Sequence, residues 1–272
     1  MADKRWAKRT QGIPRWSPSK LNCFQQCGER FRRRYVLGER GSGPSIPAAI
    51  GRGVHAAAEH DNRAKQLLGE SMLLPELAEC AVTEYEATIQ EGVEASPHDI
   101  GRGKDTAADA AILYGQAISP TIARPVICEE PIVAGIGDIE LAGITDYADE
   151  QAVYDLKFGR KVQADWVARC NQLSCYGLIY RARTGRYPER LAIDNIHNGK
   201  RGLEHTRIWT TRTEGDYRAF FERVRLAQQS VEAGVFMPAG EYESSCNPRW
   251  CEFWNSCPFV TPARRAYWEA NR

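Results

Sequence analysis

Two short strands joined by a turn are predicted from one stretch, residues 143–161, which reads GITDYADEQAVYDLKFGRK. Asp146 lies near the end of the first strand and Asp155 lies in the second, with eight residues between them. Lys157 follows two residues after Asp155, so both side chains point to the same face of that strand. The stretch has two interpretations: a hairpin whose charges are solvated, or a site where the carboxylates hold a metal ion beside the lysine.

The residue types make the second interpretation chemically specific. Mg²⁺ binds oxygen atoms in an octahedron and is usually held by one or two carboxylates, so Asp146 and Asp155 could share one ion across the hairpin. A lysine beside a metal-bound water can position that water, help to deprotonate it, and offset charge on a phosphoryl group. The spacing alone does not separate the two interpretations.

Charge is distributed unevenly along the 272 residues, although the formal net charge is only +1. Residues 1–40 hold eleven Lys or Arg against three Asp or Glu, and residues 126–156 hold eight Asp or Glu and no Lys or Arg. A basic arm suits a polyanion, and an acidic strip that folds closely needs solvent or a cation. Hydrophobic residues make up 43% of the chain, enough for a substantial core in one large domain or two small ones.

The sequence lacks the signals that would direct it out of the cytoplasm. Its N-terminus, MADKRWAKRTQGIPRW, has no apolar core of a secretory signal, and no run of about 18 apolar residues predicts a membrane span. Nine cysteines at uneven spacing then favour thiols or metal ligands over disulfides. We therefore expect a cytoplasmic protein with no membrane partner.

Hydrophobic periodicity and turn residues predict helices first and strands later. Ser17-Pro18 starts a helix that continues past the arginines at 30–34. Further helices are predicted over 48–69, 75–92, 105–120, 162–184 and 214–233, and strands over 125–133, 139–147, 152–158, 191–197 and 202–211, the last two about a turn at Asn198-Gly199. This order predicts an α/β fold, with a mixed central sheet flanked by helices and a helical N-terminal half.

Two further features on the predicted helices favour a metal site over a solvated hairpin. His55, in residues 51–55 (GRGVH), can point inward from its helix; such a histidine is otherwise packed or solvated. Gln172 and Tyr176 lie four residues apart and share one face of the helix over 162–184, which is otherwise an ordinary amphipathic helix.

The C-terminal tail holds three cysteines within twelve residues, Cys246, Cys251 and Cys257, in the pattern C-x4-C-x5-C. Zinc and iron–sulfur clusters usually take four protein ligands, so the tail is one ligand short. Cys27 is the best candidate for the fourth because of its helix face and neighbours, with Cys23 as second choice. The alternative is three buried thiols. Buried thiols are expected for the remaining cysteines, Cys80, Cys128, Cys170 and Cys175.

In this order the pieces resemble the PD-(D/E)XK nuclease superfamily, in the RecB-like iron–sulfur branch that includes CRISPR-associated adaptation nucleases, bacterial AddB-type helicase–nucleases and many phage exonucleases. The resemblance covers nearly the whole chain. It rests on six motifs: residues 17–21 (SPSKL) with Phe24 and Cys27, residues 51–55 (GRGVH), residues 143–146 (GITD), residues 155–157 (DLK), Gln172 with Tyr176, and Cys246 with Cys251 and Cys257.

The resemblance implies a restriction-endonuclease-like core whose N- and C-terminal segments are joined by a metal cluster. It implies catalytic roles for Asp146, Asp155, Lys157, Gln172 and Tyr176, and a Mg²⁺ or Mn²⁺ ion held by His55, Asp146, Asp155 and the Leu156 carbonyl. It also implies an iron–sulfur cluster of the 4Fe-4S type on Cys27, Cys246, Cys251 and Cys257. The spacing C-x4-C in place of the common C-x2-C, and Gly28 in place of a common proline, leave zinc open as the alternative.

The implied function is that of a metal-dependent DNA nuclease, an exonuclease in recombination or DNA end processing that acts on single- or double-stranded ends. A recombination or single-strand-binding protein would be a further partner. We expect one domain, residues 1–272, with a cluster region at 17–36 and 240–260, a helical insertion at 60–122 and a catalytic sheet core at 125–211. The alternative function is a non-catalytic DNA-binding module that the iron–sulfur or zinc site keeps folded.

Contacts to DNA phosphates are expected from the basic arm, which could follow the backbone without reading bases. Its candidates are Arg30, Arg32, Arg33 and Arg34, with Lys4, Arg5, Lys8 and Arg9. The alternative is that several of these residues form a solvated helix face.

Overall fold

The computed structural model describes residues 15–39, 41, 43–240 and 243–271, which fall into two compact units. The first unit takes its residues from 1–42, 135–142 and 218–272, and the second from 43–134 and 143–217. The predicted metal site therefore lies in the second unit, and the predicted cysteine cluster lies in the first. Among the described helices, none combines the length and apolar character that a membrane span requires.

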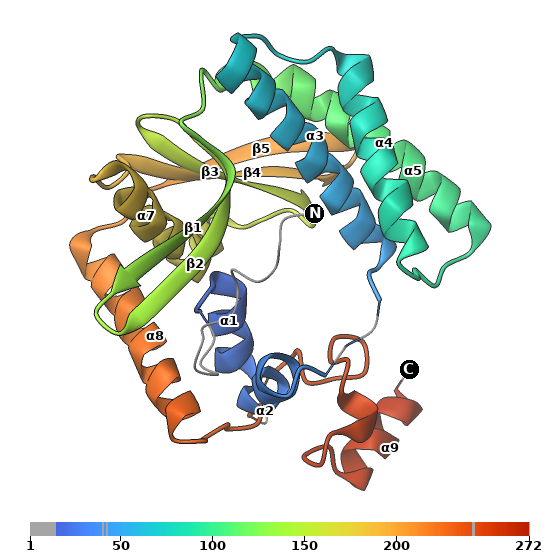
Figure 1. The fold of residues 1–272 in the computed structure, drawn as a ribbon. Helices are drawn as coiled ribbons and strands as arrows, with labels where there is room; N and C mark the ends of the chain where they lie inside the picture. Colours follow the sequence, from blue (N-terminus) through green and yellow to red (C-terminus); the bar gives the residue numbers. More distant parts are fainter. Residues whose placement is uncertain (1–14, 40, 42, 241–242, 272) are drawn as a thin grey trace. The chain divides into compact units, whose positions relative to one another are not determined.

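A five-stranded mixed sheet confirms the predicted α/β fold (Figure 1). Its strands follow the order of the chain: β1 Ile127–Ile136, β2 Ile139–Ala148, β3 Ala152–Gly159, β4 Arg190–Gly199 and β5 Gly202–Thr210. β2 and β3 run antiparallel, as do β4 and β5, whereas β3 and β4 run parallel. A parallel pair needs a crossover, and two helices supply it, α6 Ala164–Arg169 and α7 Asn171–Thr184.

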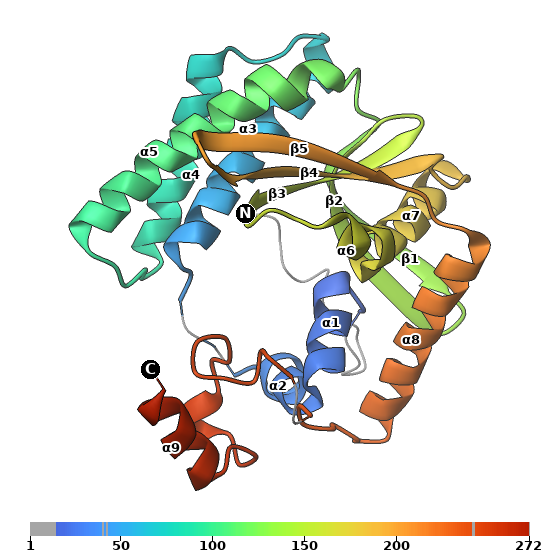
Figure 2. The ribbon, with the colours of Figure 1, turned by 180° about the vertical axis from the view of Figure 1, so that it is seen from behind.

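Three helices of the second unit cover one face of its strands, and α7 lies at the other, as Figure 1 and Figure 2 show. The three are α3 Ile46–Leu68, α4 Leu74–Gln90 and α5 Pro97–Leu113. They share a buried core with Tyr154 and Leu156 of β3. Because strand side chains alternate, Asp155 and Lys157 point to the opposite face, where Gln172 of α7 contacts Asp155.

β2 and β3 separate beside the predicted metal site. The Cα partners in their antiparallel ladder are Tyr147 with Tyr154 and Ala148 with Val153. One step further in the same register would set Asp146 opposite Asp155, but among the described residues the ladder ends before that step. Backbone groups of β3 beyond this point need other partners, and side chains can supply them.

The first unit holds α1 Pro18–Gln26, α2 Gly28–Phe31, a π-helical turn at Arg32–Val36 and α9 Pro262–Ala270. Ser17 caps α1 as predicted, since its hydroxyl accepts the Lys20 N–H at 3.3 Å. The predicted unbroken helix is wrong: Cys27 has extended backbone (φ −161°, ψ 107°), and its Sγ caps α2. Gly28 accompanies the break, because its N–H donates to the Met237 carbonyl at 2.7 Å and a Cβ would lie 2.7 Å from the Met237 backbone.

Other predicted boundaries are wrong where local turn chemistry decides them. The helix predicted over 105–120 begins at Pro97, because Ser96 caps it in the same way as Ser17 caps α1. The helix predicted over 162–184 is interrupted at Cys170, whose backbone is extended. The hairpin turn lies at residues 200–201, because Asn198 and Gly199 continue β4 and pair with β5. The last long helix, α8 Glu214–Glu232, has its predicted extent.

Gly53→Ala should destabilise the protein, whereas Gly51→Ala in the same helix should not. A Cβ at Gly53 would lie 2.5 Å from the Ala81 carbonyl oxygen of α4, but a Cβ at Gly51 meets nothing within 4 Å. Overpacking costs about 1–3 kcal/mol, and alanine in place of an uncrowded helix glycine contributes up to about 1 kcal/mol. Urea unfolding measures the difference, and equal stabilities of the two variants would contradict this packing of α3, which carries His55.

Candidate active site

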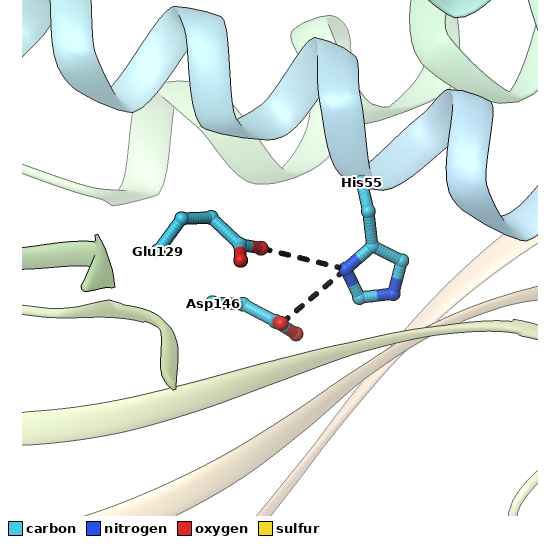
Figure 3. A group of neighbouring side chains, drawn as sticks. All are labelled: His55, Glu129 and Asp146. Atoms are coloured by element: carbon cyan, nitrogen blue, oxygen red, sulfur yellow. Dashed lines mark ion pairs between the residues drawn. The ribbon is translucent and has the colours of Figure 1, made fainter. Parts of the chain in front are cut away.

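The side chains of His55, Glu129 and Asp146 converge from α3, β1 and β2 (Figure 3). His55 Nδ1 lies 3.3 Å from Asp146 Oδ1 and 3.9 Å from Glu129 Oε1. One ligand atom from each of the three residues lies within 4.8 Å of the other two. An imidazole nitrogen and carboxylate oxygens at this separation suit a divalent cation such as Mn²⁺ or Mg²⁺.

Asp146 is fixed at the point where β2 and β3 separate. Its Oδ2 accepts the backbone N–H of Leu156 at 2.6 Å, so the carboxylate takes the place of a strand partner. The N–H and C=O groups of one strand residue point to the same edge of the strand, and the Leu156 carbonyl therefore points to the same side of β3 as this hydrogen bond. This orientation is compatible with the ligand role predicted for that carbonyl.

Asp155 is buried and contacts two of the predicted site residues directly. Lys157 Nζ lies 3.0 Å from Asp155 Oδ1 and 2.7 Å from Oδ2. Gln172 Nε2 donates to Asp155 Oδ1 at 2.6 Å and lies 3.0 Å from the Tyr176 hydroxyl. Within the described part of the chain, Asp155 Oδ2 has the charge contact with Lys157 and accepts no hydrogen bond. This buried oxygen is therefore suited to a further ligand.

The crowding of acids in a buried place shifts their pKa values. Burial raises the pKa of Asp155 to about 6, against the attraction of the Lys157 ammonium. Burial likewise raises the pKa of Glu129 to about 7, against its pairing with His55. Burial would lower the pKa of His55, but the Asp146 carboxylate, with Glu129, raises it to about 10. A metal-free site therefore holds protons that a bound cation would displace.

Glu129 is the site residue that the sequence prediction missed. It was visible only as one of eight acids in residues 126–156, with nothing to distinguish it from its neighbour Glu130. Its backbone has φ 45°, and among the described residues it is the one non-glycine with positive φ. Such a conformation is costly and concentrates at functional sites. Cys128 and Ile127 beside it are both buried, so the alternation of β1 is broken here.

The four predicted DNA-contact arginines lie in the first unit, and each lies within ion-pair distance of a carboxylate. Arg30 and Arg34 approach Glu252 at 2.7 and 3.7 Å. The other two pairs are Arg32 with Glu29 at 2.7 Å and Arg33 with Glu39 at 2.6 Å. These ion pairs give the arginines a structural use within their own unit. Lys4, Arg5, Lys8 and Arg9 lie outside the described residues.

The four predicted cluster cysteines also belong to the first unit. Burial raises the pKa of Cys246, and the Cys27 and Cys257 thiols act on it in the same direction against Arg264. Burial raises the pKa of Cys251, which Cys246 also influences. Cys246 is thus within electrostatic range of the other three thiols. Among the described residues, however, no three of these sulfurs lie within 4.8 Å of one another.

The remaining cysteines agree only in part with the expectation of buried thiols. Cys128, Cys170 and Cys175 are buried, whereas Cys80 is half-buried. Cys23, the second choice for the fourth cluster ligand, is buried, and burial raises the pKa of its thiol to about 11.

Comparisons with known proteins bear on the family and the fold of the chain. A family model described as the PD-(D/E)XK nuclease superfamily matches residues 15–258. The crystal structure of a candidate exonuclease from Eubacterium rectale matches with a TM-score of 0.61 at 13% identity, over 92% of this chain and 91% of that chain. The structure of SSO0001 matches with a TM-score of 0.34 at 13% identity, over 89% of this chain and 96% of that chain. No curated protein sequence matches the chain.

Mn²⁺ should raise the melting temperature more at about pH 8 than at about pH 5, because metal ligands must lose their protons to bind. Glu129 and Asp155, with pKa values of about 7 and about 6, are protonated at the lower pH and charged at the higher one. Their charged forms destabilise the metal-free fold as the pH rises through those values, and the cation offsets that cost. Saturating metal stabilises by about 2.7 kcal/mol at a hundred times its Kd.

Thermal unfolding of the wild type and of Asp146→Asn, with and without Mn²⁺, measures this effect. Asp146→Asn should lose the metal-dependent shift at both pH values. A shift of equal size at both pH values, or one that Asp146→Asn retains, would place the cation elsewhere.

Proposed function

Because the chain belongs to the PD-(D/E)XK nuclease superfamily, we propose that it is a metal-dependent DNA nuclease that hydrolyses phosphodiester bonds at the group described above. The observation that carries the proposal is the convergence of His55, Glu129 and Asp146 where β2 and β3 separate, with the pair Asp155 and Lys157 on β3 at the same point. Members of this superfamily use divalent metals, and the donor atoms of this site are those that such ions prefer.

The metal ligands in this proposal are His55, Asp146, Asp155 and the Leu156 carbonyl, with Glu129 added to the predicted set. When bound, the cation would lower the pKa of a water molecule and stabilise charge on phosphate oxygens. Support for the fit comes from Asp155 Oδ2, which is buried without a hydrogen bond. An imidazole among the ligands favours Mn²⁺ over Mg²⁺, because nitrogen suits transition metals better.

Lys157 is proposed to act as a cation rather than as a base. Burial would lower the pKa of its ammonium, but the nearby Asp155 and Asp146 carboxylates raise it above the ordinary value. A charged Lys157, held by Asp155, can donate a hydrogen bond to a phosphate oxygen or to the attacking water. Gln172 supports this arrangement, because its amide holds Asp155 and contacts Tyr176.

The finer features of the activity rest on the motifs and on the fold. The resemblance to the RecB-like branch supports an exonuclease in recombination or DNA end processing, in a cytoplasmic setting and with phage relatives. The fold is shared with a protein described as a candidate exonuclease. An intact set of Asp146, Asp155 and Lys157 argues against the non-catalytic alternative. Release of label from end-labelled single- and double-stranded DNA, with metal and with a chelator, tests the activity itself.

We further propose that Cys27, Cys246, Cys251 and Cys257 hold an iron–sulfur cluster. Four cysteine thiolates are the ligand set that a 4Fe-4S cluster takes from protein. The Cys27 and Cys257 thiols act electrostatically on Cys246, as Cys246 does on Cys251, which supports a shared ligand set. A tetrahedral zinc ion on the same four thiolates is the alternative. Either metal would join the start of α2 to the C-terminal tail.

Asp155→Asn and Lys157→Ala should each reduce cleavage on the order of 10²–10³-fold while leaving DNA affinity within a few-fold of wild type. Such losses are typical when one group that stabilises developing charge is removed, whereas affinity comes mostly from phosphate contacts. The matched control is Asp165→Asn, which removes an exposed carboxylate on α6. Cleavage at near wild-type rate by Asp155→Asn with either metal would show that the chemistry occurs elsewhere.

Glu129→Gln should raise the Mn²⁺ concentration needed for half-maximal cleavage, whereas Glu130→Gln should not. The two residues are adjacent, but Glu129 is beside His55 and Asp146, and Glu130 pairs with Arg183 at the surface. Loss of one ligand or close ligand partner costs about 10–100-fold in metal affinity or activity. Cleavage rates over a range of metal concentrations measure the shift, and identical curves for the two variants would remove Glu129 from the site.

Cys27→Ser should remove the visible absorbance of an iron–sulfur protein and lower its stability. Cys27 and Cys246 lie more than two hundred residues apart, and a covalent tie of that loop length is worth roughly 5 kcal/mol in the chain-entropy model. Cys80→Ser is the control, because Cys80 is also half-buried but lies in the second unit, and this variant should keep colour and stability. Full iron content and wild-type melting in soluble Cys27→Ser protein would assign the fourth ligand to another residue.

A further inference from the structure

A buried ionic network lies on the face of the sheet opposite the Asp155 side chain. Its centre is Asp194 of β4, which is 0% exposed. Asp194 is the Cα partner of Leu156 in β3 and of Arg207 in β5. By strand alternation, its side chain lies on the face of the sheet opposite Asp155 and Lys157.

Three side chains contact the two oxygens of the Asp194 carboxylate. Arg207 donates from Nε to Oδ1 at 2.7 Å and from Nη2 to Oδ2 at 2.9 Å. His205 Nε2 lies 2.7 Å from Oδ1, and the Tyr147 hydroxyl donates to Oδ2 at 2.6 Å. A carboxylate offers about four lone-pair positions, so these four contacts leave none for a metal ion or a substrate. Asp194 is therefore suited to positioning its neighbours and not to chemistry.

The network holds the last strand pair before β2 and β3 separate. That pair is Tyr147 and Tyr154, whose rings stack at 5.0 Å between centroids with an interplanar angle of 22°. The Arg207 guanidinium lies 4.9 Å from the centre of the Tyr154 ring. One arginine thus contacts Asp194 and Tyr154 together, and Asp194 in turn holds the Tyr147 hydroxyl. Both tyrosines are almost fully buried, which restricts their movement.

Each of these tyrosines is the chain neighbour of a metal-site carboxylate. Tyr147 follows Asp146, and Tyr154 precedes Asp155. The hydrogen bond from the Leu156 N–H to Asp146 Oδ2, at 2.6 Å, bridges the two strands one step beyond the pair. A small shift of Tyr147 against Tyr154 would move Asp146 against Asp155, because the β2–β3 ladder of the described residues ends at that pair.

We propose that the Asp194–Arg207 pair, acting through Tyr147 and Tyr154, sets the separation of the Asp146 and Asp155 carboxylates and so tunes metal binding and turnover. The part of the proposal that concerns turnover rests on the proposed nuclease function. Asp194, Arg207 and Tyr147 are positioning residues in this proposal. A merely structural network would change stability and leave metal dependence unchanged.

Tyr147→Phe tests the proposal, because it removes the hydroxyl that Asp194 holds and keeps the stacked ring. Tyr85→Phe is the matched control: Tyr85 is also 0% exposed, and its hydroxyl donates to the Ile100 carbonyl at 2.8 Å in the pair α4 and α5. Two readouts are needed for each variant. They are the Mn²⁺ dependence of the melting temperature, which requires no activity, and kcat for DNA cleavage at saturating metal.

Tyr147→Phe should weaken Mn²⁺ affinity or kcat on the order of 10-fold, as expected for outer residues that orient metal ligands. Tyr85→Phe should alter only the melting temperature in the absence of metal. Asp194→Asn, which breaks the two-pronged arginine contact, should have the larger effect of the same kind. The proposal is overturned if Tyr147→Phe and Tyr85→Phe have the same metal dependence and kcat. A wild-type protein that binds Mn²⁺ but cleaves no DNA would overturn the nuclease function and leave the metal-affinity test standing.

Discussion

The hydrogen bond from the Leu156 N–H to the Asp146 carboxylate is the interaction on which the rest of the site depends. It occurs where the antiparallel pairing of β2 and β3 ends, so a side chain replaces a backbone partner. Because the strands part at this point, a carboxylate on each strand can approach a common position without ladder bonds between them. The other parts of the site follow: α3 brings His55 to Asp146, and α7 brings Gln172 to Asp155.

The arrangement concentrates like charges, and the protein offsets them only in part. Asp146 and Glu129 lie close together, and the charge of Asp146 also acts on Asp155. Burial raises the pKa of Asp155 and of Glu129 above their ordinary values. Lys157 and His55 supply positive charge, but Asp155 still keeps a buried oxygen without a hydrogen bond. Folding this group without a cation is therefore costly, and a divalent ion would relieve the cost. The same electrostatic feature connects stability, pH dependence and the proposed catalysis.

The spacing of residues within one strand or one helix predicts the contacts of the site that form within that element. Asp155 and Lys157 share a strand face and Gln172 and Tyr176 share a helix face, and the structure has both pairs in contact. Glu129 could not be chosen in this way, because its approach depends on a positive φ and on where α3 lies. The break at Cys27 depends on the backbone of Met237, far away in the sequence. The positioning role proposed for Asp194 could not be predicted from local sequence, because it depends on the strand order that places Asp194 between Leu156 and Arg207.

Anomalous diffraction from crystals grown with Mn²⁺ would locate the ion without reference to activity. We expect a manganese peak bound by His55, Asp146 and Asp155, beside the Leu156 carbonyl and within reach of Glu129. Manganese bound elsewhere, with Asp146 still in contact with His55 and the Leu156 N–H and Asp155 still in contact with Lys157 and Gln172, would contradict this assignment.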